Sequence, residues 1–144
     1  MKAPDDDVQL DLDCEEAELL RRFVEGHYAA GRRPKGSFCD YLARWPRLVR
    51  RVEEGYALTI YDYANDLYIR KGLEDLKNEV PPSLRQKLSD WLEPWDRRFE
   101  EATRPSDRPV LFPRLERSDG EWFFRVPKRM GPELKKDLRN EGLL

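Results

Sequence analysis

Apolar residues recur every three or four positions along most of this chain, the spacing that places side chains on one face of an α-helix. The first such stripe follows Asp13 and Glu16, which are spaced as a capping box, and it predicts a helix that ends between Gly26 and Gly31. The residues before it, 1–12, are rich in aspartate, and we expect them to form a mobile acidic arm.

Two longer stripes predict helices that each contain a proline. The first covers residues 37–52 and the second covers residues 83–102. Proline lacks the backbone donor that a helix interior needs. We therefore expect a break or kink just ahead of Pro46, and a kink about one turn ahead of Pro94.

The segment 56–78 is apolar around most of its circumference. Between its two apolar sides runs a narrow polar strip, formed by Thr59, Asp62, Asp66 and Arg70. A helix that is apolar on nearly every side is enclosed by other elements, so we place this helix in the middle of a bundle. The double proline at 81–82 ends it.

Beyond residue 104 the pattern changes from helical to extended. The segments 109–116 and 121–127 flank an Asp-Gly pair at 119–120, which is typical of a tight hairpin turn. Because a two-stranded hairpin is marginally stable alone, we expect Trp122 and its neighbours to pack on the helices or on a partner. A short C-terminal helix begins at Pro132.

The pattern therefore predicts a mainly α fold: a four-to-five-helix bundle with a C-terminal β-hairpin at 109–127 and a short terminal helix. We expect residues 13–144 to form a single helical domain. The chain has 144 residues, and apolar and charged residues each make up 39 % of it. No apolar run approaches the roughly 18 residues of a membrane span, and no apolar leader is visible, so we expect a cytoplasmic protein without membrane contact.

Charge is unevenly distributed, although the formal net charge is only −2. Residues 1–18 hold eight acids and one base, whereas residues 19–51 hold nine bases and two acids. The basic part includes four arginines around Trp45, namely Arg44, Arg47, Arg50 and Arg51. Such a helix can follow phosphates and stack bases, which predicts nucleic-acid binding. The other interpretation is that the chain's own acidic arm, or a partner, neutralises it.

Groups that carry catalysis are scarce. His27 is the single histidine, and no motif of a nucleophilic triad or of a phosphate-binding loop is present. Cys14 and Cys39 have neither redox nor zinc-site spacing, and we interpret them as reduced thiols. We therefore expect no catalytic residue, no metal ion and no cofactor.

Two carboxylates keep one catalytic alternative open. Asp62 and Asp66 are one helical turn apart, so they can converge on a divalent cation or share a proton, as in a metal-dependent hydrolase. Arg70 lies one turn further on, and an Asp66–Arg70 pair is the simpler interpretation. Arg97 or Arg98 of the next helix can neutralise Asp62 in the same way.

Residues 56–104 resemble small uncharacterised bacterial proteins with an acidic-aromatic helix, a double-proline break and a helix that ends in an Asp-Arg-Phe-Thr pattern. Some proteins of that kind resemble the immunity partners of bacterial toxins. The positions that carry the resemblance are Tyr61, Asp62, Tyr63, Asn65, Asp66, Leu67, Arg70, Trp95, Asp96, Arg97, Phe99 and Thr103.

The sequence thus favours a non-catalytic protein-binding module, of the immunity or antitoxin type that neutralises a partner enzyme by surface complementarity. Tyrosine, tryptophan and arginine are the usual anchors of such interfaces. The residues that we expect at the interface, where exposed, are Tyr61, Asp62, Asp66, Tyr68, Asp96 and Trp122. The expected partner is another protein, a toxin or enzyme. A homodimer is a second alternative, and nucleic acid is the least favoured partner of the three.

Overall fold

The structure is a computed structural model that describes residues 8–27, 38–111 and 120–144. These residues have a mainly α fold with a small antiparallel sheet, which confirms the predicted fold class. The elements in chain order are α1 (Cys14–His27), α2 (Phe38–Glu54), α3 (Ile60–Glu79), α4 (Pro82–Ala102), β1 (Thr103–Pro105), the 3₁₀ helix η2 (Glu121–Phe124), β2 (Arg125–Pro127) and α6 (Pro132–Asn140).

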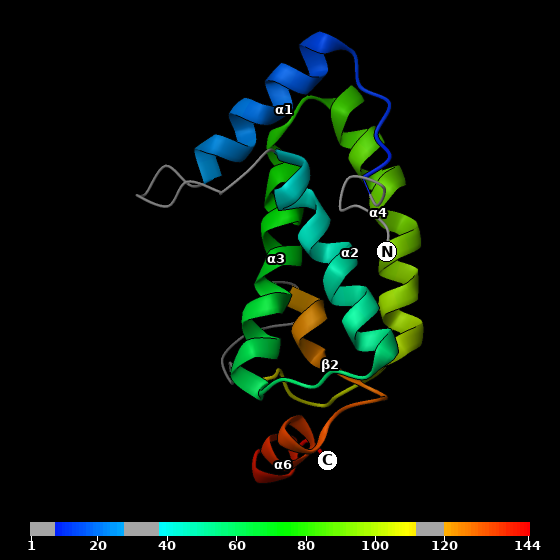
Figure 1. The fold of residues 1–144 in the computed structure, drawn as a ribbon. Helices are drawn as coiled ribbons and strands as arrows, with labels where there is room; N and C mark the ends of the chain where they lie inside the picture. The colour runs from blue at the N-terminus through cyan, green and yellow to red at the C-terminus, as the bar shows by residue number, and fades with distance from the viewer. Residues whose placement is uncertain (1–7, 28–37, 112–119) are drawn as a thin grey trace.

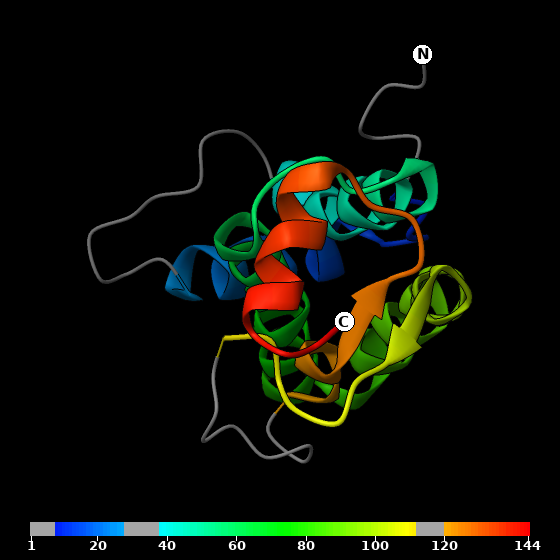
Figure 2. The same ribbon diagram turned by 90° about the horizontal axis from the view of Figure 1, so that it is seen from below.

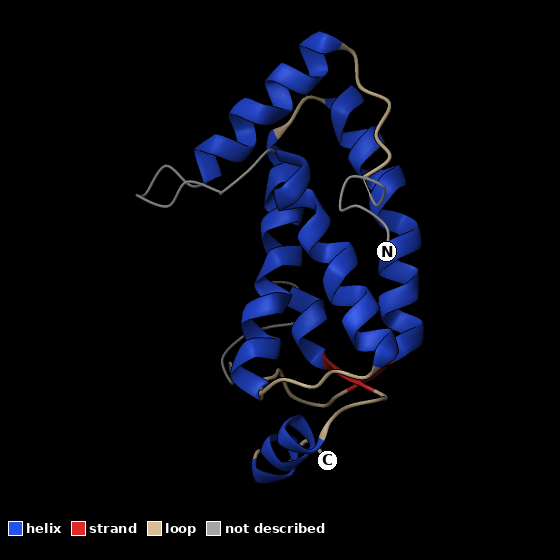
Figure 3. Cartoon of the chain, in the orientation of Figure 1, coloured by secondary structure: helices blue, strands red, loops and turns tan. Residues whose placement is uncertain are grey.

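Helices α2, α3 and α4 lie side by side along the length of the molecule, and α1 lies across one end of them (Figure 1). At the other end η2 packs on α3, and α6 covers the end of the bundle (Figure 2). The two short strands lie between the bundle and α6 (Figure 3). None of the helices in the described ranges is both long and apolar enough to cross a bilayer.

Helices α2 and α4 both continue through their internal prolines. Of the break or kink predicted just ahead of Pro46, the break is wrong, because α2 is one helix from Phe38 to Glu54, and the kink stays a prediction. A proline inside a helix costs about 3 kcal/mol. Burial of a large apolar side chain returns about 1.5–3 kcal/mol, and α2 buries several of them. The buried side chains of α2 include Tyr41, Leu42, Trp45, Leu48, Val49 and Val52.

Helix α3 begins at Ile60, four residues later than the pattern predicts. Its start is fixed by a capping box, in which the Thr59 hydroxyl accepts from the backbone N–H of Asp62 and the Asp62 carboxylate accepts from that of Thr59, both at 3.2 Å. The chain before it is extended, and Tyr56 forms an isolated bridge with Met130.

The buried positions of α3 rotate about the helix axis. In the N-terminal half they are Ile60, Tyr63, Ala64 and Leu67, which share one side, and in the C-terminal half they are Arg70, Leu73 and Leu76, which lie towards the opposite side. This rotation explains why the sequence is apolar almost all the way round. The helix contacts α1, α2, α4, α6 and η2, yet each half keeps an open face.

The sheet forms at a different place from the predicted hairpin. Thr103 pairs with Pro127 and Pro105 pairs with Arg125, so the first strand precedes the segment 109–116, most of which lies outside the described residues. Residues 121–124, predicted as strand, form η2. Successive side chains of a strand point to opposite faces, so a strand with one solvent-exposed face cannot bury three in a row. Trp122, Phe123 and Phe124 are all buried. A 3₁₀ turn that is enclosed by other elements can bury all three.

The described part of the acidic arm, residues 8–12, lies against the bundle. Its alternate apolar side chains, Val8, Leu10 and Leu12, pack on the core. The Lys87 ammonium fixes the arm by donating to the Asp11 carbonyl and the Glu16 carboxylate, each at 2.7 Å. Residues 1–7 lie outside the described residues.

Candidate functional site

The six residues expected at an interface fall into two groups. Tyr61, Asp62 and Tyr68 are exposed on α3. Asp66 is half-buried, whereas Asp96 and Trp122 face the interior, where Trp122 is 8 % exposed. The structure therefore does not bring the six together on one surface, and the exposed group lies along the N-terminal half of α3.

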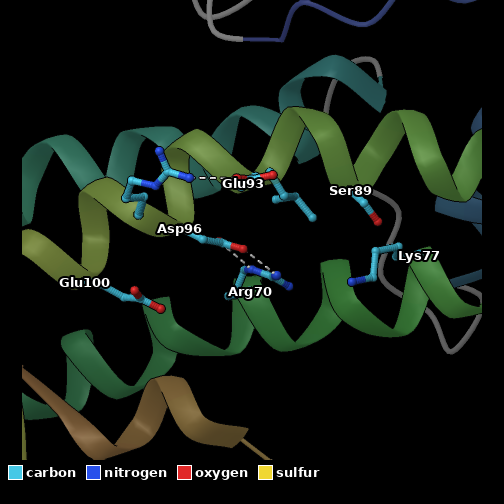
Figure 4. A pocket seen from close by; sticks show the side chains of 8 residues that line it. Arg70, Lys77, Ser89, Glu93, Asp96 and Glu100 are labelled. Carbon is cyan, nitrogen blue, oxygen red and sulfur yellow. Dashed lines mark hydrogen bonds and ion pairs between the residues drawn. The ribbon is translucent and has the colours of Figure 1, made fainter.

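The interior group belongs to a charged network centred on Arg70. The Arg70 guanidinium donates to both oxygens of Asp96, at 2.9 and 2.8 Å (Figure 4). It also donates to the Glu74 carboxylate at 3.0 Å. Trp45 donates its indole N–H to the same Asp96 carboxylate at 2.9 Å. Asp96 thus joins α2, α3 and α4, and the expected Asp66–Arg70 pair is replaced by an Arg70–Asp96 pair.

Aromatic rings enclose this network. The Arg70 guanidinium lies over the Trp122 ring, 4.6 Å from its centroid. The ring centroids of Trp45, Phe99 and Trp122 lie no more than 6.0 Å from one another. Burial opposes the charge of Arg70, but the hydrogen bonds and charges of Asp96 and Glu74 outweigh it and raise the Arg70 pKa. Arg70 is only 3 % exposed, so the network holds the fold together rather than offering a contact surface.

A shallow groove of about 300 Å³ runs between α3 and α4 above this network (Figure 4). Most of its charged groups are paired: Arg70 with Asp96 at 2.8 Å, Arg97 with Glu93 at 2.7 Å, and Lys77 with Glu74, which lies outside the groove, at 2.8 Å. The Lys77 and Arg70 hydrogen bonds overcome the effect of burial on Glu74 and lower its pKa. The groove therefore presents neutralised pairs rather than a reactive group.

The two aspartates of the proposed metal site have separate structural roles. The Asp62 carboxylate caps α3, and Asp66 accepts a hydrogen bond of 2.6 Å from the Tyr56 hydroxyl. Burial raises the pKa of Asp66 despite that bond, and burial together with Asp66 raises the pKa of Tyr56. Within the described ranges, no group of three or more His, Cys, Asp and Glu side chains is arranged to hold a metal ion.

The arginines of α2 flank a tryptophan that no ligand can reach. Trp45 is 0 % exposed, so the expectation that it stacks bases is wrong. The guanidinium of Arg44 lies over the Tyr41 ring at 5.9 Å, and that of Arg50 lies over the Trp95 ring at 5.4 Å. Arg47 and Arg51 are exposed.

The open face at the N-terminal half of α3 carries large side chains in contact with solvent. Tyr61 is 68 % exposed and Tyr68 is 46 % exposed. Asn65 lies between them, and positions 61, 65 and 68 share one side of a helix. Leu58, 44 % exposed, comes just before the helix start, and the sequence analysis missed it as an exposed residue because it placed Leu58 inside the helix. We call Tyr61, Asn65 and Tyr68 the tyrosine face.

The tyrosine face rests on a firm base. The Tyr68 ring meets the buried Phe123 of η2 edge-on, with centroids 5.0 Å apart. The neighbouring Tyr63 is fully buried and donates its hydroxyl to the Arg125 carbonyl at 2.7 Å, and burial raises its pKa. Since the backbone below is fixed on two sides, the exposed rings of Tyr61 and Tyr68 project from a rigid support.

Two groups singled out from the sequence give no further site. His27 is the last residue of α1, and its side chain lies outside what the structure describes. Cys14 is an exposed free cysteine at the start of α1, and the side chain of Cys39 is likewise not described.

Comparison with known proteins found no match among family models, curated proteins or solved structures. The site must therefore be interpreted from its own geometry.

Proposed function

We propose that this chain is a protein-binding module whose contact surface is the tyrosine face of α3. The observation that carries the proposal is the exposure of Tyr61, 68 %, and Tyr68, 46 %, two turns apart on one side of a helix that is packed on its other sides. Tyrosine combines a large apolar ring with a hydrogen-bonding hydroxyl, and it is enriched in protein interfaces. A rigid helix that presents tyrosines loses little conformational entropy on binding.

The partner that fits is a folded protein with an apolar groove for the rings and polar groups at its rim for the hydroxyls and Asn65. The resemblance of residues 56–104 to immunity-type proteins supports an enzyme in this role. Among the positions that carry that resemblance, Tyr61, Asp62 and Asn65 are exposed and available for contact, whereas Asp96 and Phe99 hold the core.

The test compares one substitution at two exposed positions of α3. Asn65→Arg places a long charged side chain in the middle of the tyrosine face, and Asn78→Arg places it at the far end of the same helix. Each tagged full-length protein is used to capture partners from a lysate of the source organism, and the affinity of the recovered partner is then measured by interferometry. We expect Asn65→Arg to weaken binding by about tenfold or more, with Asn78→Arg equal to the unmodified chain.

Equal loss or equal retention in the two variants would contradict the proposal, and so would the absence of any captured protein. Analytical ultracentrifugation addresses the homodimer directly. If Asn65→Arg converts a dimer into a monomer, then the partner is a second copy of this chain rather than an enzyme.

A further inference from the structure

Helix α6 lies at one extremity of the molecule and carries positive charge on its outer side (Figure 1). Its inner side buries Leu134 and Leu138, both 0 % exposed. Lys135, Lys136 and Arg139 are all exposed. With 3.6 residues per turn, these three positions occupy about a third of the helix circumference, and the two leucines lie outside that third. We call Lys135, Lys136 and Arg139 the basic face of α6.

The three cations are available to a ligand. Among the described residues, no hydrogen bond or ion pair engages any of their side chains. A cation in the last turn of a helix is stabilised by the helix dipole, which accounts for Arg139. Lys135 and Lys136 stand in the first half of α6, where the dipole gives a cation no stabilisation. The stability of the helix therefore explains Arg139 but neither lysine.

The helix that carries the basic face is fixed to the rest of the fold along its length. In its middle, the Asp137 carboxylate accepts from the backbone N–H of Ile60, the first residue of α3, at 3.1 Å. At its C-terminal end, the Arg108 guanidinium donates to the Glu141 carbonyl at 2.7 Å. Because α6 is already held in place, a ligand does not have to order it on binding.

We propose that the basic face of α6 binds a compact acidic patch on the surface of a partner protein. Such a patch places carboxylates against the three cations, and electrostatic complementarity of this kind speeds association and selects the partner. Two exposed carboxylates of this chain, Glu133 beside the face and Glu141 beyond the helix end, limit the area that attracts anions. The basic face includes no residue of the tyrosine face, so either proposal can fail without the other.

The surroundings of the basic face favour a protein over nucleic acid or a membrane. Residues 125–144 contain no aromatic ring on which a base could stack, and a duplex that runs past the helix would bring its phosphates to Glu133 and Glu141. Binding to an anionic membrane is typical of about four to eight clustered basic residues, or of a helix whose apolar side inserts among the lipids. The basic face has three cations, and Leu134 and Leu138 are buried in the fold.

The experiment uses the full chain, isotope-labelled for NMR, and synthetic helical peptides. The first peptide presents three glutamates on one side of its helix, at the spacing of the basic face. The second has the same composition with the glutamates distributed around the helix. A short DNA duplex and vesicles that contain an anionic phospholipid are the other two probes. Titrations at low and at physiological salt give the affinity of each probe and the residues whose signals shift.

We expect the first peptide to shift the backbone amide signals of α6 and to bind more tightly than the second, with an affinity that falls as salt is raised. The double variant Lys135→Gln/Lys136→Gln should lower that affinity about tenfold at low salt. The matched control, Arg22→Gln/Arg47→Gln, removes two exposed cations from α1 and α2 and should leave the affinity unchanged.

Several results would overturn the inference. Equal binding of the two peptides, no binding of either at low salt, or signal shifts confined to residues outside α6 would each do so. An equal loss in the control variant would mean that overall charge, and not the basic face, attracts the peptide. Tighter binding of the duplex or the vesicles than of the first peptide, with the same dependence on Lys135 and Lys136, would assign the basic face to nucleic acid or to a membrane instead.

Discussion

Arginines on neighbouring helices of this protein are used in opposite ways. Arg70 of α3 is 3 % exposed, donates to Asp96 and Glu74, and lies over the ring of Trp122. Arg47 and Arg51 of α2 are exposed, and no ion pair in the described part of the chain holds them. The first arrangement joins helices, whereas the second leaves the charges exposed on the surface.

The difference comes from what surrounds each side chain. Arg70 is the first buried residue of the C-terminal half of α3, where the buried side differs from that of the N-terminal half. Both α4 and η2 contact α3. A buried guanidinium is tolerated only when anions and hydrogen bonds replace the water it has lost. On α2, Arg47 and Arg51 are exposed to solvent, so water replaces the anions that Arg70 needs.

The largest effect is expected from Asp96→Ala, which leaves the buried Arg70 without its bidentate partner. Removing one member of a buried ion pair costs about 3–5 kcal/mol, because the other charge stays buried and uncompensated. The free energy of unfolding from urea denaturation measures this loss. Glu93→Ala breaks the exposed pair with Arg97 on the same helix and should cost less than about 1 kcal/mol. Comparable losses in both variants would mean that Arg70 is not effectively buried.

A smaller effect is expected where Tyr41 of α2 lies against Gly72 of α3. A Cβ atom added at Gly72 would lie 2.7 Å from the hydroxyl oxygen of Tyr41, so Gly72→Ala forces the Tyr41 side chain to move. We expect a loss of about 1–3 kcal/mol, the usual cost of overpacking. In a Tyr41→Phe background the hydroxyl is absent, and Gly72→Ala should instead stabilise by up to about 1 kcal/mol through helix propensity. Denaturant unfolding of the four proteins checks this sign reversal, and its absence would contradict the contact.

Asp66 is a half-buried carboxylate whose hydrogen-bond partner is the Tyr56 hydroxyl rather than a guanidinium group. Burial raises its folded-state pKa above the ordinary 3.8. A raised carboxyl pKa contributes stability below the unfolded pKa, and this contribution is lost as pH rises through the folded pKa. The Asp66→Asn variant should therefore gain stability relative to the unmodified chain as pH rises from about 4 to 7, since Asn keeps an acceptor for Tyr56. Denaturant unfolding at several pH values measures the difference in the free energy of unfolding between the two proteins. If Asp66→Asn instead loses stability relative to the unmodified chain as pH rises, the folded-state pKa of Asp66 is lowered, as in a paired carboxylate.

The smallest effect on stability is expected from the exposed arginines. Arg47→Gln/Arg51→Gln should change the free energy of unfolding by less than about 0.5 kcal/mol, because neither side chain is paired or buried in the described structure. Thermal unfolding of the two proteins is sufficient to check it. A loss of several kcal/mol would mean that Arg47 and Arg51 stabilise the fold as Arg70 does. The proposed contrast between buried and exposed arginines would then be wrong.

Some features were predictable from the sequence because they depend on neighbours along the chain. The capping box of Asp13 and Glu16 forms as predicted, with a 2.8 Å bond from the Glu16 N–H to the Asp13 carboxylate. The apolar stripes of α2 and α4 are buried, and the C-terminal helix starts at Pro132. The start of α3 was missed although Thr59 and Asp62 have capping-box spacing, because the apolar stripe was extended back to Tyr56.

The candidate site was less predictable. Tyr61 and Tyr68 are predicted contact residues and are exposed, whereas Trp122, predicted with them, is buried, and Asp96 is partly buried and bonded to Arg70. Periodicity shows that a helix has two sides. It does not show which neighbouring element covers each side, and this decides whether a tyrosine or an aspartate meets solvent.

The sequence by itself determined the helices, their approximate ends and the sides of α2 and α4 that are buried, since these follow from residue spacing and local hydrogen bonds. Tertiary structure alone decided that Arg70 pairs with Asp96, 26 positions away. It also decided that β2 pairs with β1, residues 103–105, rather than with the predicted strand at 109–116. It also decided that the open side of α3 carries tyrosines. A buried charge needs an opposite charge, and a buried strand needs hydrogen-bond partners for its backbone. Groups far away in the sequence supply both, and they come within reach only when the helices and strands pack together.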